Sequence, residues 1–262
     1  MKNASPNNSN SLPQKPHSLH VDFCNIRSLN NKIVLVKDYC KSSDVDLLFL
    51  TESWLSPALS NSVICPNDYN TIRSDRIRSK GGGVVLFYKR HLKISNLCEI
   101  NSDTSNDDLN FEFVCIELTD GKRPLRFLCM YVPPSHSRCK DTVKNICKTV
   151  SRYISASVPF YVLGDFNMPK IDWTNLTCTG GPAQESFLTF CIENCLSQCI
   201  NEASRPFHTD NILDLLFCNN AASSLLLSYS VKQPLTSTCD HSLISFAIQL
   251  LKLISSLLLS EF

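Results

Sequence analysis

The sequence predicts an α/β fold built on mixed β-sheets. Apolar runs of strand length alternate with segments of helical period along the chain. Two pairs of these predicted strands follow each other through short links, which favours antiparallel neighbours beside parallel ones. The 262 residues suffice for one large domain with its own core. A composition of 43% hydrophobic and 19% charged residues is typical of a globular chain.

The predicted strands cover residues 21–25, 45–51, 84–88, 111–118, 126–132, 160–163, 212–217 and 243–248. The run 45–51 is almost continuously apolar, as in strands buried on both faces. Strands 111–118 and 126–132 are joined through Asp120-Gly121, a turn dipeptide. Residues 31–40, 141–154 and 183–196 have helical periodicity, and the last of these is amphipathic.

No internal repeat or linker divides the chain. Residues 1–18 are rich in Asn, Ser and Pro and predict a disordered leader without a signal peptide. One domain is expected over 19–249. The apolar tail 250–262 is interrupted by Lys252 and is too short for a membrane span, so an amphipathic helix or a tail exposed by truncation is expected.

The 14 cysteines contain no Cys-x-x-Cys pair, which argues against both a zinc site and a disulfide scaffold. Several lie inside apolar runs, where cysteine acts as a small hydrophobic residue. We therefore expect an intracellular, reducing location and no contact with a membrane.

The charge is nearly balanced, at +1 overall, which is weak evidence against tight nonspecific binding to DNA. The segment 73–93 nevertheless carries seven basic residues, opposed by Asp75 alone. Arg73, Arg76 and Lys80 are our candidate phosphate contacts within it. A solvated surface loop would give the same pattern.

Polar side chains recur at the ends of the apolar runs. Asn25, Glu52 and Tyr131 each end or follow such a run, and Asp165 and Asn167 follow another. Strand ends can hold convergent polar groups rigidly around a cleft. One such position would mean little, but five favour a functional site.

Asp165 and Asn167 lie on one side of an extended chain, with Phe166 between them. A carboxylate can take a proton from water, and a neighbouring amide can orient that water. The surrounding Gly-Asp-Phe-Asn-Met-Pro also has strong turn composition, and both interpretations are compatible.

Asp214 stands within an apolar run, so its charge needs a buried partner, for which a histidine N–H is suited. The adjacent Asp240 and His241 precede the last apolar run, although a surface pair without function remains an alternative. Glu52 and Asp240 offer the oxygen ligands that a hard cation such as Mg²⁺ prefers.

The order of seven short motifs resembles the endonuclease/exonuclease/phosphatase superfamily, and in particular the endonuclease domains of non-LTR retrotransposons. They are Asn-Ile-Arg-Ser (25–28), Leu-Thr-Glu-Ser-Trp-Leu (50–55), Gly-Gly-Gly-Val (81–84), Tyr-Val-Pro-Pro-Ser (131–135), Leu-Gly-Asp-Phe-Asn (163–167), Ile-Leu-Asp-Leu (212–215) and Cys-Asp-His-Ser (239–242). The resemblance runs from about Val21 to Ile248. It implies a four-layer α/β sandwich, with two packed β-sheets flanked by helices.

The resemblance also implies a metal site. Glu52 would bind Mg²⁺, for which Mn²⁺ can substitute, with Asn25 and Asp240 close by. Two departures favour the retrotransposon branch over the repair enzymes. Arg27 stands where many repair-type relatives carry a further acidic ligand, and we count it among the candidate nucleic-acid contacts. Pro134 stands where many carry Asn.

The remaining roles follow from the same resemblance. Asp165 would activate or position the attacking water with the help of Asn167, and Tyr131 would touch the scissile phosphate. His241, held by Asp214, would stabilise the charge of the transition state. The sequence leaves open how Asp165 and His241 divide this work.

The implied enzyme is a metal-dependent phosphodiesterase that nicks double-stranded DNA and leaves a 3′-hydroxyl, as in target-primed reverse transcription. An active enzyme of this type would be expected in the nucleus. Such domains are normally fused to a reverse transcriptase, and none follows here. Two alternatives stay open: a phosphatase or RNA nuclease of the same superfamily, and an inactive remnant of a truncated retroelement.

Overall fold

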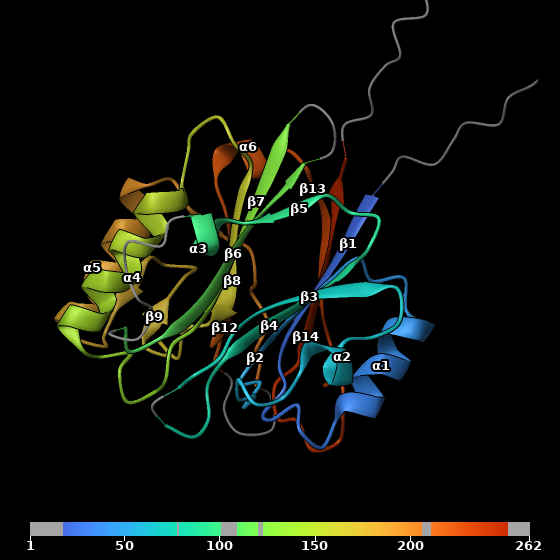
Figure 1. The fold of residues 1–262 in the computed structure, drawn as a ribbon. Coiled ribbons are helices and arrows are strands. Elements are labelled where there is room, and N and C mark those ends of the chain that lie inside the picture. Colours follow the sequence, from blue (N-terminus) through green and yellow to red (C-terminus); the bar gives the residue numbers. More distant parts are fainter. Residues whose placement is uncertain (1–17, 78, 101–108, 120–122, 206–210, 251–262) are drawn as a thin grey trace, which may run out of the picture.

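The computed structural model describes residues 18–250 except 78, 101–108, 120–122 and 206–210. Two six-stranded β-sheets pack face to face, and helices lie on their outer sides (Figure 1). The predicted turn at 120–121, nearly all of the predicted leader and nearly all of the predicted tail fall outside the described residues. The first strand begins at Ser18, one residue before the predicted start of the domain.

The first sheet has the spatial order β13-β14-β1-β2-β4-β3. Its strands are β1 (Ser18–Asn25), β2 (Leu47–Thr51), β3 (Tyr69–Ser74), β4 (Val84–Lys89), β13 (Leu226–Lys232) and β14 (Leu243–Gln249). β1 and β2 are parallel, and the other neighbours are antiparallel. This sheet is therefore mixed, as predicted.

The second sheet has the order β11-β12-β8-β7-β6-β5. Its strands are β5 (Ile94–Asn96), β6 (Glu112–Thr119), β7 (Pro124–Tyr131), β8 (Phe160–Asp165), β11 (Ser197–Gln198) and β12 (Asp214–Cys218). Only β7 and β8 run parallel. A short ribbon of β9 (Ile171–Asp172) and β10 (Thr177–Cys178) lies beside it.

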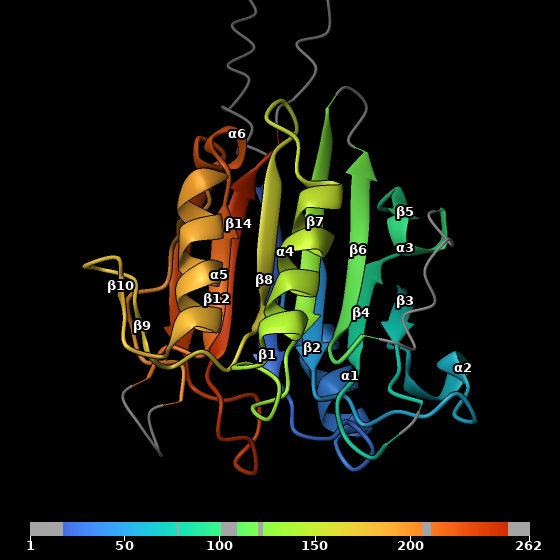
Figure 2. The same ribbon diagram turned by 90° about the vertical axis from the view of Figure 1, so that its left-hand side faces the viewer.

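The helices complete four layers. They are α1 (Ile33–Ser42), α2 (Asn61–Ile64), α3 (Leu97–Ile100), α4 (Lys140–Tyr153), α5 (Pro182–Glu193) and α6 (Asn220–Ser223). α1 covers the first sheet, and α4 and α5 lie side by side over the second (Figures 1 and 2). None of the helices in the described part of the chain is long and apolar enough to cross a membrane.

Three hydrophobic cores separate these layers. The central core lies between the sheets, where Phe49 of β2 meets Phe127 of β7 with ring centroids 6.1 Å apart. A second core joins the other face of β8 to α4 and α5. A third lies between the first sheet and α1. Because strand side chains alternate, each sheet packs one face into the central core and the other face against helices. This explains the nearly unbroken apolar runs of β2 and β8.

The differences from prediction have simple causes. The strands β3 and β13 were not predicted, because they form the two edges of the first sheet and their partly exposed sequences mix polar and apolar residues. The helix predicted over 183–196 ends at Glu193. Cys195 has a φ of 51°, which a right-handed helix cannot accommodate.

Candidate active site

The sandwich brings the predicted polar residues to one edge of the two sheets. Asn25, Tyr131 and Asp165 end β1, β7 and β8, and Glu52 directly follows β2. Asp214 begins β12, which runs antiparallel to β8, so its Cα pairs with that of Asp165 at the same edge. Each of these residues is thus held at the end of a buried strand, where backbone pairing limits its motion.

A hydrogen bond between Asn25 and Asp165 joins the two sheets at this edge. The Asn25 Nδ2 donates to Asp165 Oδ2 over 2.9 Å, and both side chains are buried. The Asn25 Oδ1 accepts from the backbone N–H of Arg27 at 3.1 Å, which fixes the orientation of the amide. Asn25 therefore positions the Asp165 carboxyl across the interface between the sheets.

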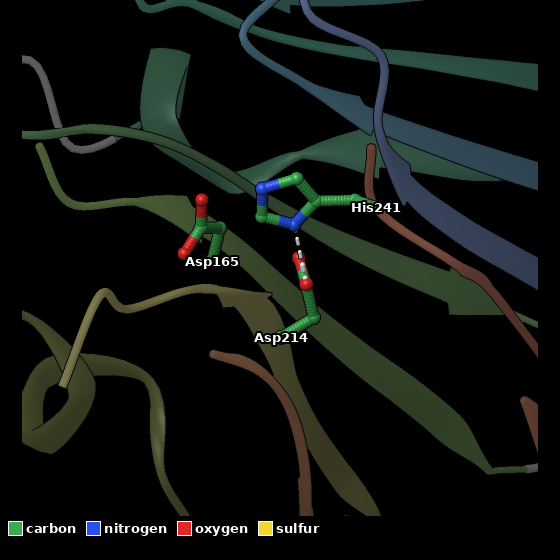
Figure 3. Close-up of side chains that lie close together, drawn as sticks. All are labelled: Asp165, Asp214 and His241. Atoms are coloured by element: carbon green, nitrogen blue, oxygen red, sulfur yellow. Dashed lines mark hydrogen bonds and ion pairs between the residues drawn. The ribbon is translucent and has the colours of Figure 1, made fainter. Parts of the chain in front are cut away.

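Asp165, Asp214 and His241 form a compact cluster (Figure 3). His241 Nδ1 lies 2.6 Å from Asp214 Oδ2, so the partner expected for the buried Asp214 is the predicted one. Potential ligand atoms from all three side chains lie within 4.8 Å of one another. The bond to Asp214 holds the imidazole in place and leaves its Nε2 available on the side of Asp165 (Figure 3).

The electrostatics of the cluster separate the two titrating groups. Burial and the charge of Asp214 raise the pKa of Asp165 to about 8, although His241 and Asn25 act in the opposite direction. Burial alone would lower the pKa of His241, but the nearby carboxylates of Asp214, Asp165 and Asp240 outweigh it and raise the pKa to about 10. The imidazole is therefore cationic at neutral pH, whereas the Asp165 carboxyl can exchange a proton near neutrality.

Glu52 and Tyr131 connect the first sheet to the second on the neighbouring strands. The Tyr131 hydroxyl donates to Glu52 Oε1 at 2.7 Å, and Trp54 Nε1 donates to Glu52 Oε2 at 3.2 Å. Tyr131 and Asp165 are register partners on β7 and β8. Burial and the charge of Glu52 raise the pKa of Tyr131, so its hydroxyl remains a proton donor.

Asn167 is held by the backbone. Its Nδ2 donates to the carbonyl of Val132 at 2.9 Å, and its own N–H donates to Asp165 Oδ1 at 3.1 Å. This arrangement requires a φ of 51°, which Asn tolerates better than most residues. Asn167 thus orients the carboxyl of Asp165 through its backbone N–H.

Left-handed backbone conformations concentrate around the site. Arg27, Ser28, Glu52 and Asn167 all have φ between 46° and 76°. Such conformations are uncommon for residues other than Gly and persist where the surrounding structure enforces them.

The buried Lys32 is one source of that enforcement. Its ammonium donates to the carbonyl oxygens of residues 26, 27 and 28, at 2.7, 2.8 and 3.3 Å. These carbonyls belong to the loop that directly follows Asn25. The sequence pattern did not single out Lys32, because a lysine at a helix N-terminus ordinarily points into solvent.

Asp240 is engaged by two guanidinium groups. Arg205 donates to its Oδ2 through Nε at 2.9 Å and also through Nη2, and Arg27 Nη1 lies at 3.5 Å. Burial opposes ionisation, but the hydrogen bonds and charge of Arg205 hold the pKa of Asp240 below its usual range. Asp240 Oδ2 is thus already bonded to Arg205, and the role of Asp240 as a metal ligand stays a prediction.

Sequence reasoning missed Arg205. The available signal was its isolation, because it is the only Lys or Arg between Lys170 and Lys232. The preceding Ser204 is fully buried, and its hydroxyl accepts from the backbone N–H groups of Leu213 and Asp214. The 204–205 segment thus supports Asp214 and Asp240 together.

The candidate nucleic-acid contacts divide into two groups. Arg73 and Arg76 make intramolecular bonds: Arg73 donates to the carbonyl of Leu59 at 2.7 Å, and Arg76 pairs with both oxygens of Glu112 at 2.6 and 2.8 Å. Arg27 and Lys80 have exposed side chains. Contact of any of the four with nucleic acid stays a prediction.

Arg76 nevertheless borders the site. Its guanidinium lies 5.6 Å from the centre of the Tyr131 ring. A Cβ on Gly82 would lie 2.4 Å from its Cζ, so the Gly81–Gly83 segment makes room for this side chain. The backbone N–H of Trp54 donates to the carbonyl of Gly82 at 2.9 Å, which supports the loop that presents Glu52.

The chemistry of the donors fits a divalent cation. Glu52, Asp165 and Asp214 supply carboxylate oxygens, the ligands that hard cations prefer. Asp214 Oδ1 is buried without a hydrogen-bond partner among the residues that the structure describes. Burial and repulsion from Asp214 raise the pKa of Asp165. A bound cation would compensate both features, so this edge carries a candidate carboxylate metal site with the cationic His241 beside it.

Two face-to-face mixed sheets with this cluster at one edge define an endonuclease/exonuclease/phosphatase fold. The endonuclease domain of TRAS1, a telomere-specific non-LTR retrotransposon, superposes with a TM-score of 0.68 at 14% identity, covering 89% of this chain and 100% of that one. An AP endonuclease from Archaeoglobus fulgidus gives 0.66 at 11% identity, covering 88% and 100%. A 3′ phosphatase from Neisseria, bound to a product DNA hairpin, gives 0.59 at 12% identity, covering 87% and 98%.

Residues 125–245 match the model of a family described as endonuclease-reverse transcriptase. No curated protein is similar enough in sequence to match. The family match and the fold together confirm the resemblance inferred from the motifs: this chain is similar to proteins of the endonuclease/exonuclease/phosphatase superfamily. Members of that superfamily are hydrolases that act on phosphoester bonds.

Proposed function

We propose that the chain is a divalent-metal-dependent DNA endonuclease, which hydrolyses one phosphodiester bond of a duplex and leaves a 3′-hydroxyl. The observation that carries the proposal is the His241–Asp214 pair beside Asp165, at the edge where Glu52 and Tyr131 also meet. This edge combines an acid or base, a fixed cation and a carboxylate that can ligate a metal. Those are the groups that phosphodiester hydrolysis requires.

The charges favour one division of labour. Asp165 accepts the proton of the attacking water, because its pKa of about 8 lies close to neutral pH and Asn25 fixes its orientation. His241 is cationic at that pH and donates from Nε2 to a non-bridging phosphate oxygen. It stabilises the negative charge of the transition state and does not act as the base.

Glu52 and Tyr131 would serve the cation and the phosphate. Glu52 would hold Mg²⁺, or Mn²⁺ in its place, with Asn25 nearby. Such an ion supplies Lewis acidity at the phosphate. The Tyr131 hydroxyl, now on Glu52 at 2.7 Å, can turn to a phosphate oxygen once the carboxylate has another partner.

DNA is the proposed substrate because of the family match and the relatives. The matched family joins endonuclease with reverse transcriptase, and two of the similar structures are a retrotransposon endonuclease domain and an AP endonuclease. Exposed Arg27 and Lys80 provide candidate contacts to backbone phosphates. A reverse transcriptase acting on the 3′-hydroxyl, and a nuclear location, belong to the same proposal.

The test is nicking of supercoiled plasmid by the purified chain with Mg²⁺, with Mn²⁺ and with EDTA. Glu52→Gln and His241→Ala should each lower the rate about a hundredfold or more, since one charged transition-state contact contributes roughly 3 kcal/mol. Glu185→Gln and His91→Ala are matched controls at exposed positions. Retained nicking by either site variant would overturn the assignment.

The ends and the substrate can be checked in the same preparation. A DNA polymerase should extend the nicked strand without phosphatase treatment if a 3′-hydroxyl is left. A phosphoinositide and a single-stranded RNA serve as competing substrates. The 3′ phosphatase among the similar structures makes phosphate release from DNA ends the second activity to assay. A folded chain that is inactive on all of these would support the inactive-remnant alternative.

A further inference from the structure

Two thiols lie against each other directly behind the candidate active site. Cys24 is the penultimate residue of β1, and Cys239 lies in the loop before β14. Their Sγ atoms are 3.8 Å apart, both residues are buried, and both belong to the core between the first sheet and α1. We propose that Cys24 and Cys239 are an oxidisable pair: a peroxide oxidises them to a disulfide between the two residues, and this reaction is reversible.

The separation suits bond formation. A disulfide requires sulfur atoms about 2.05 Å apart, so these atoms must approach by about 1.8 Å. Rotation about the side-chain torsions and small movements of the 239 loop can provide much of that distance. The pair also joins segments 215 residues apart in sequence, so the bond would link the first strand to the loop before the last strand.

Cys239 is reachable by a small oxidant. It lines a cavity of about 470 Å³ together with residues of the loop 233–240, including Asp240. Peroxide is small enough to enter such a cavity, and Cys24 lies directly beyond it.

The reaction balances in two steps. The sulfur of Cys239 attacks the peroxide O–O bond, giving a sulfenic acid and one water. The sulfur of Cys24 then attacks the sulfenic sulfur, and the hydroxyl leaves with the thiol proton as a second water. Two thiols are oxidised and one peroxide is reduced. A dithiol reductant reverses the step by thiol–disulfide exchange, in keeping with a reducing location.

The position of the pair predicts a consequence for the site. Cys24 precedes Asn25, and Cys239 precedes Asp240 and His241. The Cys239 Sγ–H donates to the backbone carbonyl of Asn25 at 2.7 Å, and oxidation removes this donor. The disulfide would also pull on the backbone beside His241. This part rests on the proposed function: nicking should fall about tenfold to a hundredfold, because shifts near 1 Å at a catalytic site have such effects.

The bond itself can be detected without an activity assay. Trypsin places Cys24 alone in peptide 3–27, since Lys15 precedes proline, and Cys239 alone in peptide 233–252. After peroxide treatment, alkylation and digestion, mass spectrometry should find these two peptides joined, and dithiothreitol should separate them. Recovery of both as alkylated free thiols, while exposed Cys195 is oxidised, would refute the pair. So would a sulfinic acid at Cys239 with no linked peptide.

A second thiol pair provides an internal control. Cys199 and Cys218 have Sγ atoms 3.6 Å apart, but Cys218 ends β12 four residues from Asp214, about 13 Å along the strand from the site. Both lie in one tryptic peptide, so a bond between them cannot join two peptides.

The activity test compares each variant with its own untreated sample, after catalase removes the peroxide. Wild type and Cys199→Ser should lose nicking and regain it with dithiothreitol, whereas Cys239→Ser should keep its own rate within about twofold. An equal loss in Cys239→Ser would show that the pair does not control the site. If reduced wild type does not nick at all, the proposed function fails, but the peptide map still decides whether the pair forms.

Discussion

Replacing Asp214 by Asn tests the electrostatics of the site with a nearly isosteric change. Asp214 is fully buried, and its Oδ2 lies 2.6 Å from His241 Nδ1. The amide keeps the shape but removes the charge that holds His241 in its cationic form and raises the pKa of Asp165. Both pKa values should therefore fall in this variant.

The size of the effect follows from the protonation of His241. With a pKa of about 10, the imidazole is almost wholly cationic at pH 7.5. If the pKa returns to its ordinary value of about 6.5, roughly a tenth remains cationic. The loss of His241 charge alone then lowers the nicking rate about tenfold, and the fuller ionisation of Asp165, which is about a quarter ionised in wild type at this pH, recovers up to about fourfold. Loss of the charge-assisted hydrogen bond, at about 1.5–3 kcal/mol, can bring the total to about a hundredfold.

The defect should depend on pH in one direction. At pH 6 most of the imidazole in Asp214→Asn is again cationic, and the lower pKa of Asp165 leaves more of the base ionised. The ratio of wild-type to variant rate should therefore grow from pH 6 to pH 8. Plasmid nicking across this range, with thermal unfolding to verify folding, measures it. A ratio that is constant or shrinks with pH would refute the assigned roles of Asp165 and His241.

Three other outcomes follow from the structure. Lys32→Met should lower the free energy of unfolding by about 2 kcal/mol, because three carbonyl oxygens lose their donor, whereas Lys41→Met on the exposed side of α1 should have little effect in the same urea titration. Gly164→Ala should prevent folding, because Gly164 has a φ of 148° and a Cβ there would lie 2.0 Å from a carbonyl oxygen of β7. Circular dichroism measures this, and a folded variant would contradict the close approach of β7 to β8. Without divalent metal, the free energy of unfolding should fall as pH rises from 6.5 to 8, because His241 and Asp165 both have raised pKa values in the folded state. The slope can reach about 1.4 kcal/mol per pH unit for each proton retained on folding, and the contribution of His241 is complete below pH 6.5 and is lost towards pH 10. A urea-unfolding profile that does not change with pH would argue against both shifts.

The sequence located most of the fold because strand and helix patterns are local. The apolar runs that became β2, β4, β6, β7 and β8 are buried on both faces, so no polar alternation obscures them. The edge strands β3 and β13 were missed for the opposite reason. These strands form because they pair with β14 and β4, and their own residue composition does not indicate a strand.

The candidate site divides in the same way. The apolar runs placed Asn25, Glu52, Tyr131 and Asp165 at strand ends and Asp214 within a strand, and the fold gathers all five residues at one edge. The pairing of Asp214 with His241 was foreseeable, because a carboxylate within an apolar run requires a buried partner. The roles assigned to these residues stay predictions until the variants are measured.

The sequence by itself determined the properties of short stretches: which runs must be buried, which acids need partners, and which residues follow strands. Only the tertiary structure decided the pairings that join distant segments. Arg205 with Asp240, Lys32 with the 26–28 carbonyls, Arg76 with Glu112 and Cys24 with Cys239 are of this kind. A side chain's protonation and reactivity depend on the groups within a few ångströms of it, and those neighbours are fixed by packing rather than by position along the chain.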